Sequence, residues 1–195
     1  KFSININSSI QLDSTTLIKL ILLGVIFGIV GGTFAILLSY FKGLFSRLFK
    51  HTMLKIFIIG CVLSILLLLL HLGRYSGLGT NLISNSFSGG TIFNYDWLLK
   101  LILTLLTLAV GFQGGEVTPL FAIGASLGVV LGGILGLPIM LVAALGYAAV
   151  FGSATNTIIA PILIGVEVFG PQNMIYFAIV CSFAFLFNGN KTIYT

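Results

Sequence analysis

Long apolar runs, broken by short polar segments, dominate this sequence of 195 residues. Hydrophobic residues make up 58% of the chain and charged residues only 7%, whereas soluble domains carry about 25% charged residues. A soluble domain of this length would have too few charges to keep its exposed surface in solution. The composition therefore argues against a soluble enzyme, a nucleic-acid-binding protein or a disordered chain, and it predicts an all-α integral membrane protein.

The apolar runs are predicted to form the membrane segments. The first covers residues 16–41 and is long enough to cross a bilayer at a strong tilt. The runs that follow cover residues 56–70, 97–110, 121–137, 139–151, 158–169 and 174–187. Several of these are only 12–16 residues long, whereas a simple span needs about 20 residues.

Prolines fall at or near the breaks between the later runs, at Pro119, Pro138, Pro161 and Pro171. Short hydrophobic segments interrupted by proline and glycine are typical of transporters whose helices end part-way through the bilayer. We therefore favour broken helices. The alternative is a bundle of ordinary spans whose ends lie a few residues from the positions given above.

Basic residues are concentrated between the first two runs, where Lys42, Arg47, Lys50 and Lys55 lie close together. This segment is predicted to be a cytoplasmic loop, because membrane proteins carry an excess of lysine and arginine on that side. The net charge of +5 therefore indicates the orientation of the chain rather than a surface for nucleic acid.

Two sets of glycines recur every four residues within the runs. They are Gly24, Gly28 and Gly32 in the first set, and Gly124, Gly128, Gly132 and Gly136 in the second. Small residues at this spacing let helix backbones approach closely in lipid. We expect both helices to be buried within the protein by such packing.

A glycine-rich segment with a carboxylate interrupts the apolar sequence at residues 111–121, which read GFQGGEVTPLF. We expect Thr118 to cap the helix that follows and Pro119 to occupy its first position. Because that helix is apolar, its amino terminus should lie at membrane depth, where unpaired N–H groups and the helix dipole make an anion site. Irregular backbone at this depth is tolerated only where it lines a cavity or is covered by protein.

Glu116 lies in this segment, and an acidic residue inside the membrane is by default a functional candidate. Its carboxylate could cap nearby N–H groups, or it could take up and release a proton as an anion passes; the second role is slightly favoured. The other carboxylates have simpler interpretations. Asp13 and Asp96 are predicted to cap helices, and Glu167 to anchor a helix end, with a place on a proton route as its alternative.

The segment with Glu116 resembles the second-half anion motif of the CLC family of chloride channels and transporters, G-x-F-x-P. Gly115 and Pro119 match this motif, and Val117 replaces the usual Phe. With Glu116 and Thr118 beside it, Val117 makes the segment most similar to the bacterial fluoride/proton antiporter branch of the family.

The resemblance continues along nearly the whole chain. Residues 80–83 are similar to the short helix that precedes the motif, and residues 165–167 to a helix-end glutamate two helices after it. Residues 188–194, NGNKTIY, resemble the segment that places a pore tyrosine against the central anion, which implies a hydroxyl donor at Tyr194. The first-half G-x-E-G-P loop of the family, with its gating glutamate, has no match, so Glu116 is not that gate.

The resemblance implies a CLC-type bundle of tilted and broken transmembrane helices. Residues 1–195 would form a single membrane domain, the second of two inverted-topology halves. The implied partners are an N-terminal half of the same subunit, which carries the gating glutamate, a second subunit in a homodimer, and the lipid bilayer. The expected location is the bacterial inner membrane, as a multi-pass protein.

The implied function is export of fluoride in exchange for protons. The residues implied in it are Val117, Thr118 and Tyr194 for anion binding, Glu116 for proton coupling, and Gly114, Gly115 and Pro119 for the loop and helix amino terminus. A chloride/proton antiporter and a passive anion channel on the same scaffold are alternatives, and a non-transporting scaffold is a third hypothesis. The sequence shows neither a nucleophile–base pair nor a set of metal ligands, so we expect no enzyme, metal or cofactor.

Overall fold

The chain is helical throughout the part that the structure describes. The computed structural model describes residues 4, 6, 10–49, 51–112 and 114–194, so Lys50 of the basic segment and Gln113 of the glycine-rich segment lie outside it. Over these residues there is no strand, and the elements are α1 (Ser14–Leu48), α2 (Thr52–Leu69), η1 (His71–Gly73), α3 (Thr80–Ser88), α4 (Asp96–Val110), α5 (Val117–Leu135), α6 (Ile139–Thr155), α7 (Ile159–Phe169), η2 (Pro171–Asn173) and α8 (Met174–Leu186). The all-α prediction is confirmed.

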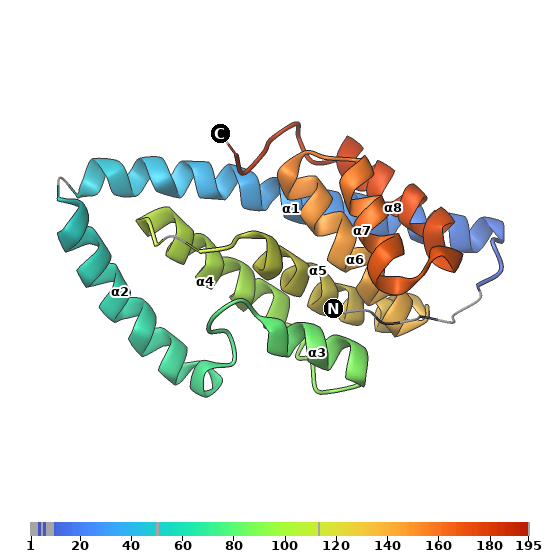
Figure 1. The fold of residues 1–195 in the computed structure, drawn as a ribbon, viewed down its shortest axis with the longest axis horizontal. Coiled ribbons are helices and arrows are strands. Elements are labelled where there is room, and N and C mark those ends of the chain that lie inside the picture. Colours follow the sequence, from blue (N-terminus) through green and yellow to red (C-terminus); the bar gives the residue numbers. More distant parts are fainter. Residues whose placement is uncertain (1–3, 5, 7–9, 50, 113, 195) are drawn as a thin grey trace.

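Helix lengths agree with the expectation of both full and broken spans. Among the described residues, α1, α2 and α5 are long and apolar enough to cross a membrane. The helices α6 and α7 and the segment formed by η2 and α8 are apolar but shorter. Figure 1 shows α1 as the long helix that starts at the upper left and passes behind α6 and α8, with α5 in the middle between α4 and α6.

The basic segment is not a loop as expected. Lys42 and Arg47 lie in the last turns of α1 and Lys55 lies in the first turn of α2, so that only residues 49–51 separate the two helices. Lysine and arginine are good helix formers, and cations near a helix carboxyl terminus are stabilised by its dipole. These interactions extend α1 beyond the apolar run that predicted it.

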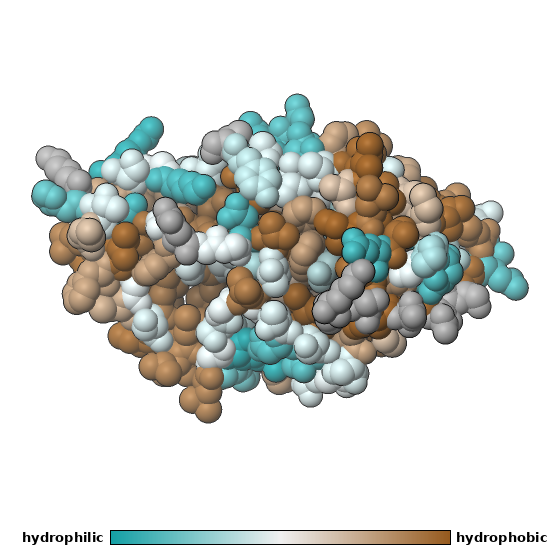
Figure 2. Space-filling view, viewed as in Figure 1, coloured by the Kyte–Doolittle hydropathy of each residue, from teal (hydrophilic) through white to brown (hydrophobic). Residues whose placement is uncertain are grey.

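The outer side of α2 is apolar and exposed. Leu63 is its only buried residue among those described. Large apolar side chains cover the rest of its surface, which is brown at the lower left of Figure 2: Met53, Leu54, Phe57, Ile58, Val62, Ile65, Leu68 and Leu69. An apolar surface of this extent needs lipid or further protein against it.

Glycines on α1 bring it into backbone contact with α8, as their spacing predicts. A methyl group added to Gly24 would lie 2.6 Å from Cβ of Phe183, and one added to Gly28 would lie 2.7 Å from the carbonyl oxygen of Ala184. At Gly32, an added methyl group would overlap the backbone of Asn188. The close contact of these helices therefore depends on the absence of side chains.

The glycines of α5 do the same against α6, with one exception. An added methyl group would overlap backbone atoms of α6 at Gly124 and Gly128, and would approach Cα of Ile139 to 3.1 Å at Gly132. A methyl group added to Gly136 would have no neighbour within 4 Å, and Gly136 has a φ of +63° as the C-cap that follows α5. Its predicted packing role is wrong, because it serves as a left-handed carboxyl-terminal cap.

Asp96 is a buried anchor rather than the simple cap that we expected. It is the first residue of α4 and is fully buried. Its carboxylate accepts hydrogen bonds from Nη2 of Arg74 at 2.6 Å, from the hydroxyl of Tyr75 at 2.6 Å and from the N–H of Phe93 at 2.9 Å. Burial and then this hydrogen bond raise the pKa of Tyr75, and the hydrogen bond to Asp96 raises the pKa of Arg74. The network holds the connection between α2 and α3 against the start of α4.

Candidate functional site

The helix α5 begins two residues earlier than predicted. Val117 is its first residue, Glu116 is its N-cap, and Pro119 is its third residue. The expected positions of Thr118 as cap and Pro119 as first residue are therefore wrong. The first turn tolerates proline at any position because its N–H groups have no partner within the helix.

Unpaired N–H groups mark this amino terminus as an electropositive site. The first backbone bond of the helix runs from the N–H of Leu120 to the carbonyl oxygen of Glu116, at 3.2 Å. Within the described part of the chain, the N–H groups of Val117 and Thr118 have no acceptor, and the hydroxyl of Thr118 makes no hydrogen bond. Two backbone donors and one hydroxyl are thus available at the positive end of the helix dipole.

The carboxylate of Glu116 does not cap α5. The half-buried side chain makes no capping bond, and it has no hydrogen bond or ion pair with any residue that the structure describes. It lines a cavity of about 350 Å³ together with Leu38, Lys42, Leu108, Gly111, Phe112 and Gly114. Of its two predicted roles, capping is excluded in this conformation, and proton coupling stays a prediction.

The segment that carries Tyr194 is held against the carboxyl terminus of α6. The N–H of Ile193 donates to the carbonyl oxygen of Ala154 at 3.0 Å, and the hydroxyl of Thr192 donates to that of Thr155 at 3.2 Å. Carbonyl groups in the last turn of a helix have no partner within it, so the final residues satisfy them. Tyr194 itself is 62% exposed, and its hydroxyl has no partner among the described residues.

An amide network fixes this final segment. The side chain of Asn188 donates to the carbonyl oxygen of Ser153 at 3.3 Å and to Oδ1 of Asn156 at 2.8 Å. Its own Oδ1 accepts from the N–H of Asn190 at 2.7 Å. The hydroxyl of Ser153 donates to the carbonyl oxygen of Gly28 on α1 at 2.6 Å. Sequence reasoning missed Ser153 and Asn156; an asparagine at the end of an apolar run is the signal for a left-handed cap.

Both parts of the predicted anion site rest on α6. Near the start of α5, Phe121 stacks on Tyr147 at a ring-centroid distance of 4.0 Å and packs on Phe151 at 5.1 Å. Phe151 lies one turn before Thr155, where the final segment is attached. The helix α6 therefore contacts both the start of α5, which carries Thr118, and the segment that carries Tyr194. No hydrogen bond between described residues joins the two hydroxyls.

Other predicted positions agree with the structure. The helix α3 begins at Thr80, as the resemblance implied, and Glu167 lies two residues before the end of α7. Sequence reasoning gave no role to Lys100, which lies in α4 and is only 2% exposed. A single lysine within an apolar run is a signal that could have indicated it.

Comparisons with known proteins agree with this geometry. A family model described as "Voltage gated chloride channel" matches residues 2–189. A curated relative, the "Chloride/fluoride channel protein" of Pseudomonas syringae pv. tomato, is 37% identical over 177 residues, which are 88% of this chain and 39% of that protein. The crystal structure of a CLC-type fluoride/proton antiporter matches the whole of this chain and 49% of its own chain, with 56% identity and a TM-score of 0.98.

This chain therefore spans less than half the length of each of these two relatives. The identity of 56% to a fluoride/proton antiporter confirms the resemblance to that branch of the CLC family. The TM-score of 0.98 confirms the CLC-type arrangement of tilted and broken helices. Because the family match covers nearly every residue, the chain belongs to the voltage-gated chloride channel family, which is the CLC family.

Proposed function

We propose that this chain forms the second half of a membrane subunit that exports fluoride in exchange for protons. The observation that carries the proposal is the amino terminus of α5, where two N–H groups, a hydroxyl and the neighbouring carboxylate of Glu116 have no partner among the described residues. The similar antiporter structure, at 56% identity, supports fluoride and protons as the transported ions.

The donors suit a small, strongly hydrated anion. Fluoride gives up its water only to dense and strong donors, and backbone N–H groups at a helix start supply them without reorganising. The hydroxyl of Thr118 adds a donor from the same turn, and Tyr194 supplies another from the final segment. Val117 leaves more space at this position than a phenylalanine would.

Glu116 is the proposed proton carrier within this half. Its carboxylate lines the cavity of about 350 Å³ and is free of hydrogen bonds to described residues. A free carboxylate next to an anion site is repelled when the anion arrives, and protonation removes the repulsion. The passage of the anion and the charge of Glu116 are coupled in this way. A gating glutamate in an N-terminal half completes the proposed exchange. Glu167 has a structural role in this proposal, as the anchor of the end of α7.

The experiment that tests the function uses the complete subunit that contains these residues, reconstituted in liposomes. Fluoride efflux and proton uptake are recorded together, and the reversal potential is measured under a fluoride gradient with and without a proton gradient. An antiporter shifts its reversal potential when the proton gradient is imposed. A reversal potential that depends on fluoride alone overturns the exchange mechanism.

A passive anion channel is the second candidate, because the relative from Pseudomonas syringae pv. tomato has a name that describes a channel protein. The same recording separates the two, since a channel selective for anions ignores the proton gradient. Replacing fluoride with chloride on both sides tests the other alternative, a chloride/proton antiporter. Chloride flux equal to fluoride flux supports that alternative.

We further propose that the subunit is a multi-pass homodimer in a bacterial inner membrane. Exposed apolar side chains on α7 and α8 support a protein or lipid partner there, with Ile159 68% and Leu186 69% exposed. Light scattering of the detergent-solubilised protein tests the oligomeric state, and a mass of one subunit contradicts it.

A further inference from the structure

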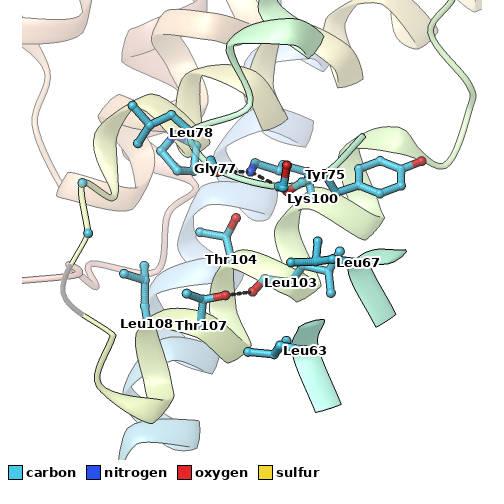
Figure 3. A pocket seen from close by; sticks show the side chains of 14 residues that line it. Leu63, Leu67, Tyr75, Gly77, Leu78, Lys100, Leu103, Thr104, Thr107 and Leu108 are labelled. Atoms are coloured by element: carbon cyan, nitrogen blue, oxygen red, sulfur yellow. Dashed lines mark hydrogen bonds between the residues drawn. The ribbon is translucent and has the colours of Figure 1, made fainter. Parts of the chain in front are cut away.

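A second cavity lies between α2, α4, the connection before α3 and the loop that leads into α5. Its volume is about 250 Å³, enough for a small ion with several waters at roughly 30 Å³ each. Figure 3 shows its lining, which consists of Leu63, Leu67, Tyr75, Ser76, Gly77, Leu78, Lys100, Leu103, Thr104, Thr107, Leu108, Gly114, Gly115 and Pro119. Leucine and proline side chains form a large part of this lining, so the polar groups determine what the cavity can hold.

Lys100 brings a positive charge to this cavity. Its side chain is 2% exposed, and its Nζ donates to the carbonyl oxygens of Tyr75 at 3.0 Å and of Gly77 at 2.7 Å (Figure 3). An ammonium group has three N–H donors, so one is left over. Within the described part of the chain, no carboxylate lies within ion-pair distance of Lys100.

The backbone around Lys100 is shaped to admit it. Gly79 has a φ of +80°, and a methyl group added there would lie 2.8 Å from Cε of Lys100 and 2.8 Å from Cβ of Ala122 on α5. The end of the lysine therefore passes through a space that only glycine leaves open. This places the charge against the second turn of α5, close to the amino terminus with Val117 and Thr118, which is called the loop site below.

Thr104 offers a second unused donor one turn along the same face of α4. It is 7% exposed, and its hydroxyl makes no hydrogen bond to any described residue. Thr107 lines the same cavity, but its hydroxyl already donates to the carbonyl oxygen of Leu103 at 2.7 Å (Figure 3). Lys100 and Thr104 therefore share a helical face and a cavity, and both keep a free donor.

We propose that this cavity is a second anion site, in which Lys100 and Thr104 hold a small monovalent inorganic anion of the halide class. A cation enclosed by leucines and without a carboxylate is costly, and an anion in the cavity compensates it. Gly114 lines both this cavity and the one that contains Glu116, so the two sites flank the same loop. The inference does not depend on fluoride/proton exchange, because it rests on donors that the loop site does not use.

Bromide is the probe that tests the site, since it scatters X-rays anomalously and fits a cavity of this size. Crystals of the complete subunit are soaked in a series of sodium bromide concentrations. We expect an anomalous peak within hydrogen-bonding distance of Nζ of Lys100 and Oγ1 of Thr104. Absence of the peak at the highest concentration overturns the proposal, and so does a peak of equal occupancy in Lys100→Met.

Thr104→Val and Thr107→Val form a matched pair that keeps the test independent of the fold. Both exchange a hydroxyl for a methyl group on the wall of one cavity, but only Thr104 has a free donor. Thr104→Val should weaken bromide binding at this site about tenfold, the loss of one hydrogen bond to an ion, while Thr107→Val leaves it unchanged. Equal binding by the two variants overturns the proposed site.

Discussion

Gly124 of α5 and Gly146 of α6 face each other so closely that a methyl group on either would overlap the carbonyl oxygen of the other. Neither helix can therefore accept a side chain at this crossing. In a membrane the hydrophobic effect does not drive helices together, so association depends on contacts of this kind. The crossing fixes α5, and with it the amino terminus that carries Val117 and Thr118.

Gly124→Ala should destabilise the fold by about 2 kcal/mol, because the added methyl group forces the two backbones apart. Gly133→Ala is the matched control, since Gly133 lies in the same helix with no atom within 4 Å of an added methyl group. It should be neutral or slightly stabilising, because alanine favours a helix more than glycine does. Thermal unfolding in detergent measures both variants. Equal unfolding temperatures for the two variants contradict the assigned role of the crossing.

Glu116→Gln should lower proton transport per fluoride roughly tenfold or more, because the amide cannot take up and release a proton. The amide has nearly the same size and makes no demand on the packing, so the protein should fold normally. Simultaneous recording of fluoride and proton fluxes in liposomes measures the ratio. Asp13→Asn is the control, since Asp13 is exposed and its side chain makes no capping bond. Unchanged coupling in Glu116→Gln excludes the proposed proton role.

Thr118→Val should weaken fluoride binding about tenfold, because it removes one hydrogen bond to an ion while preserving the shape of the side chain. Thr118→Ser retains the hydroxyl and should retain most of the affinity. Titration calorimetry with sodium fluoride on the purified subunit gives both affinities. If the Thr118→Val variant binds fluoride as well as the Thr118→Ser variant does, the Thr118 hydroxyl is not an anion ligand.

Asn188→Ala should weaken fluoride binding as much as Tyr194→Phe does, although Asn188 is not a proposed ligand. It removes the amide that joins Ser153, Asn156 and Asn190, and so releases the segment that carries Tyr194. The same calorimetry measures it, with the neighbouring surface variant Lys191→Ala as control. Normal affinity in Asn188→Ala beside weak binding in Tyr194→Phe shows that the network does not position the tyrosine.

Asp96→Asn should destabilise the fold by about 3 kcal/mol, because it leaves Arg74 without its carboxylate in a buried network. Asp13→Asn, at an exposed position, should change stability by less than about 0.5 kcal/mol. Thermal unfolding in detergent compares them. A small effect at Asp96 shows that solvent, rather than the carboxylate, compensates the charge of Arg74.

The sequence predicted the helices well because apolar runs and prolines act locally. It also predicted the loop with Glu116, since glycines, a carboxylate and a proline inside apolar sequence have few other interpretations. Asp96 was misjudged because its partners, Arg74 and Tyr75, come together only in three dimensions. Lys100 was missed for the same reason, since its acceptors are the backbone carbonyls of Tyr75 and Gly77. Every residue has a backbone carbonyl, so the sequence does not show which of them accepts a hydrogen bond.

The attachment of the final segment to Ala154 and Thr155 has a mechanical consequence. The start of α5 and the segment with Tyr194 share α6 as a common frame, so a displacement of one relative to the other requires the aromatic contacts of Phe121 or the bonds of Thr192 to break. An ion that pulls on either part therefore moves the other with it. In the exporter proposed above, the start of α5 and the segment with Tyr194 are therefore expected to shift together, and a gate that opens by relative motion is expected between them and another part of the subunit.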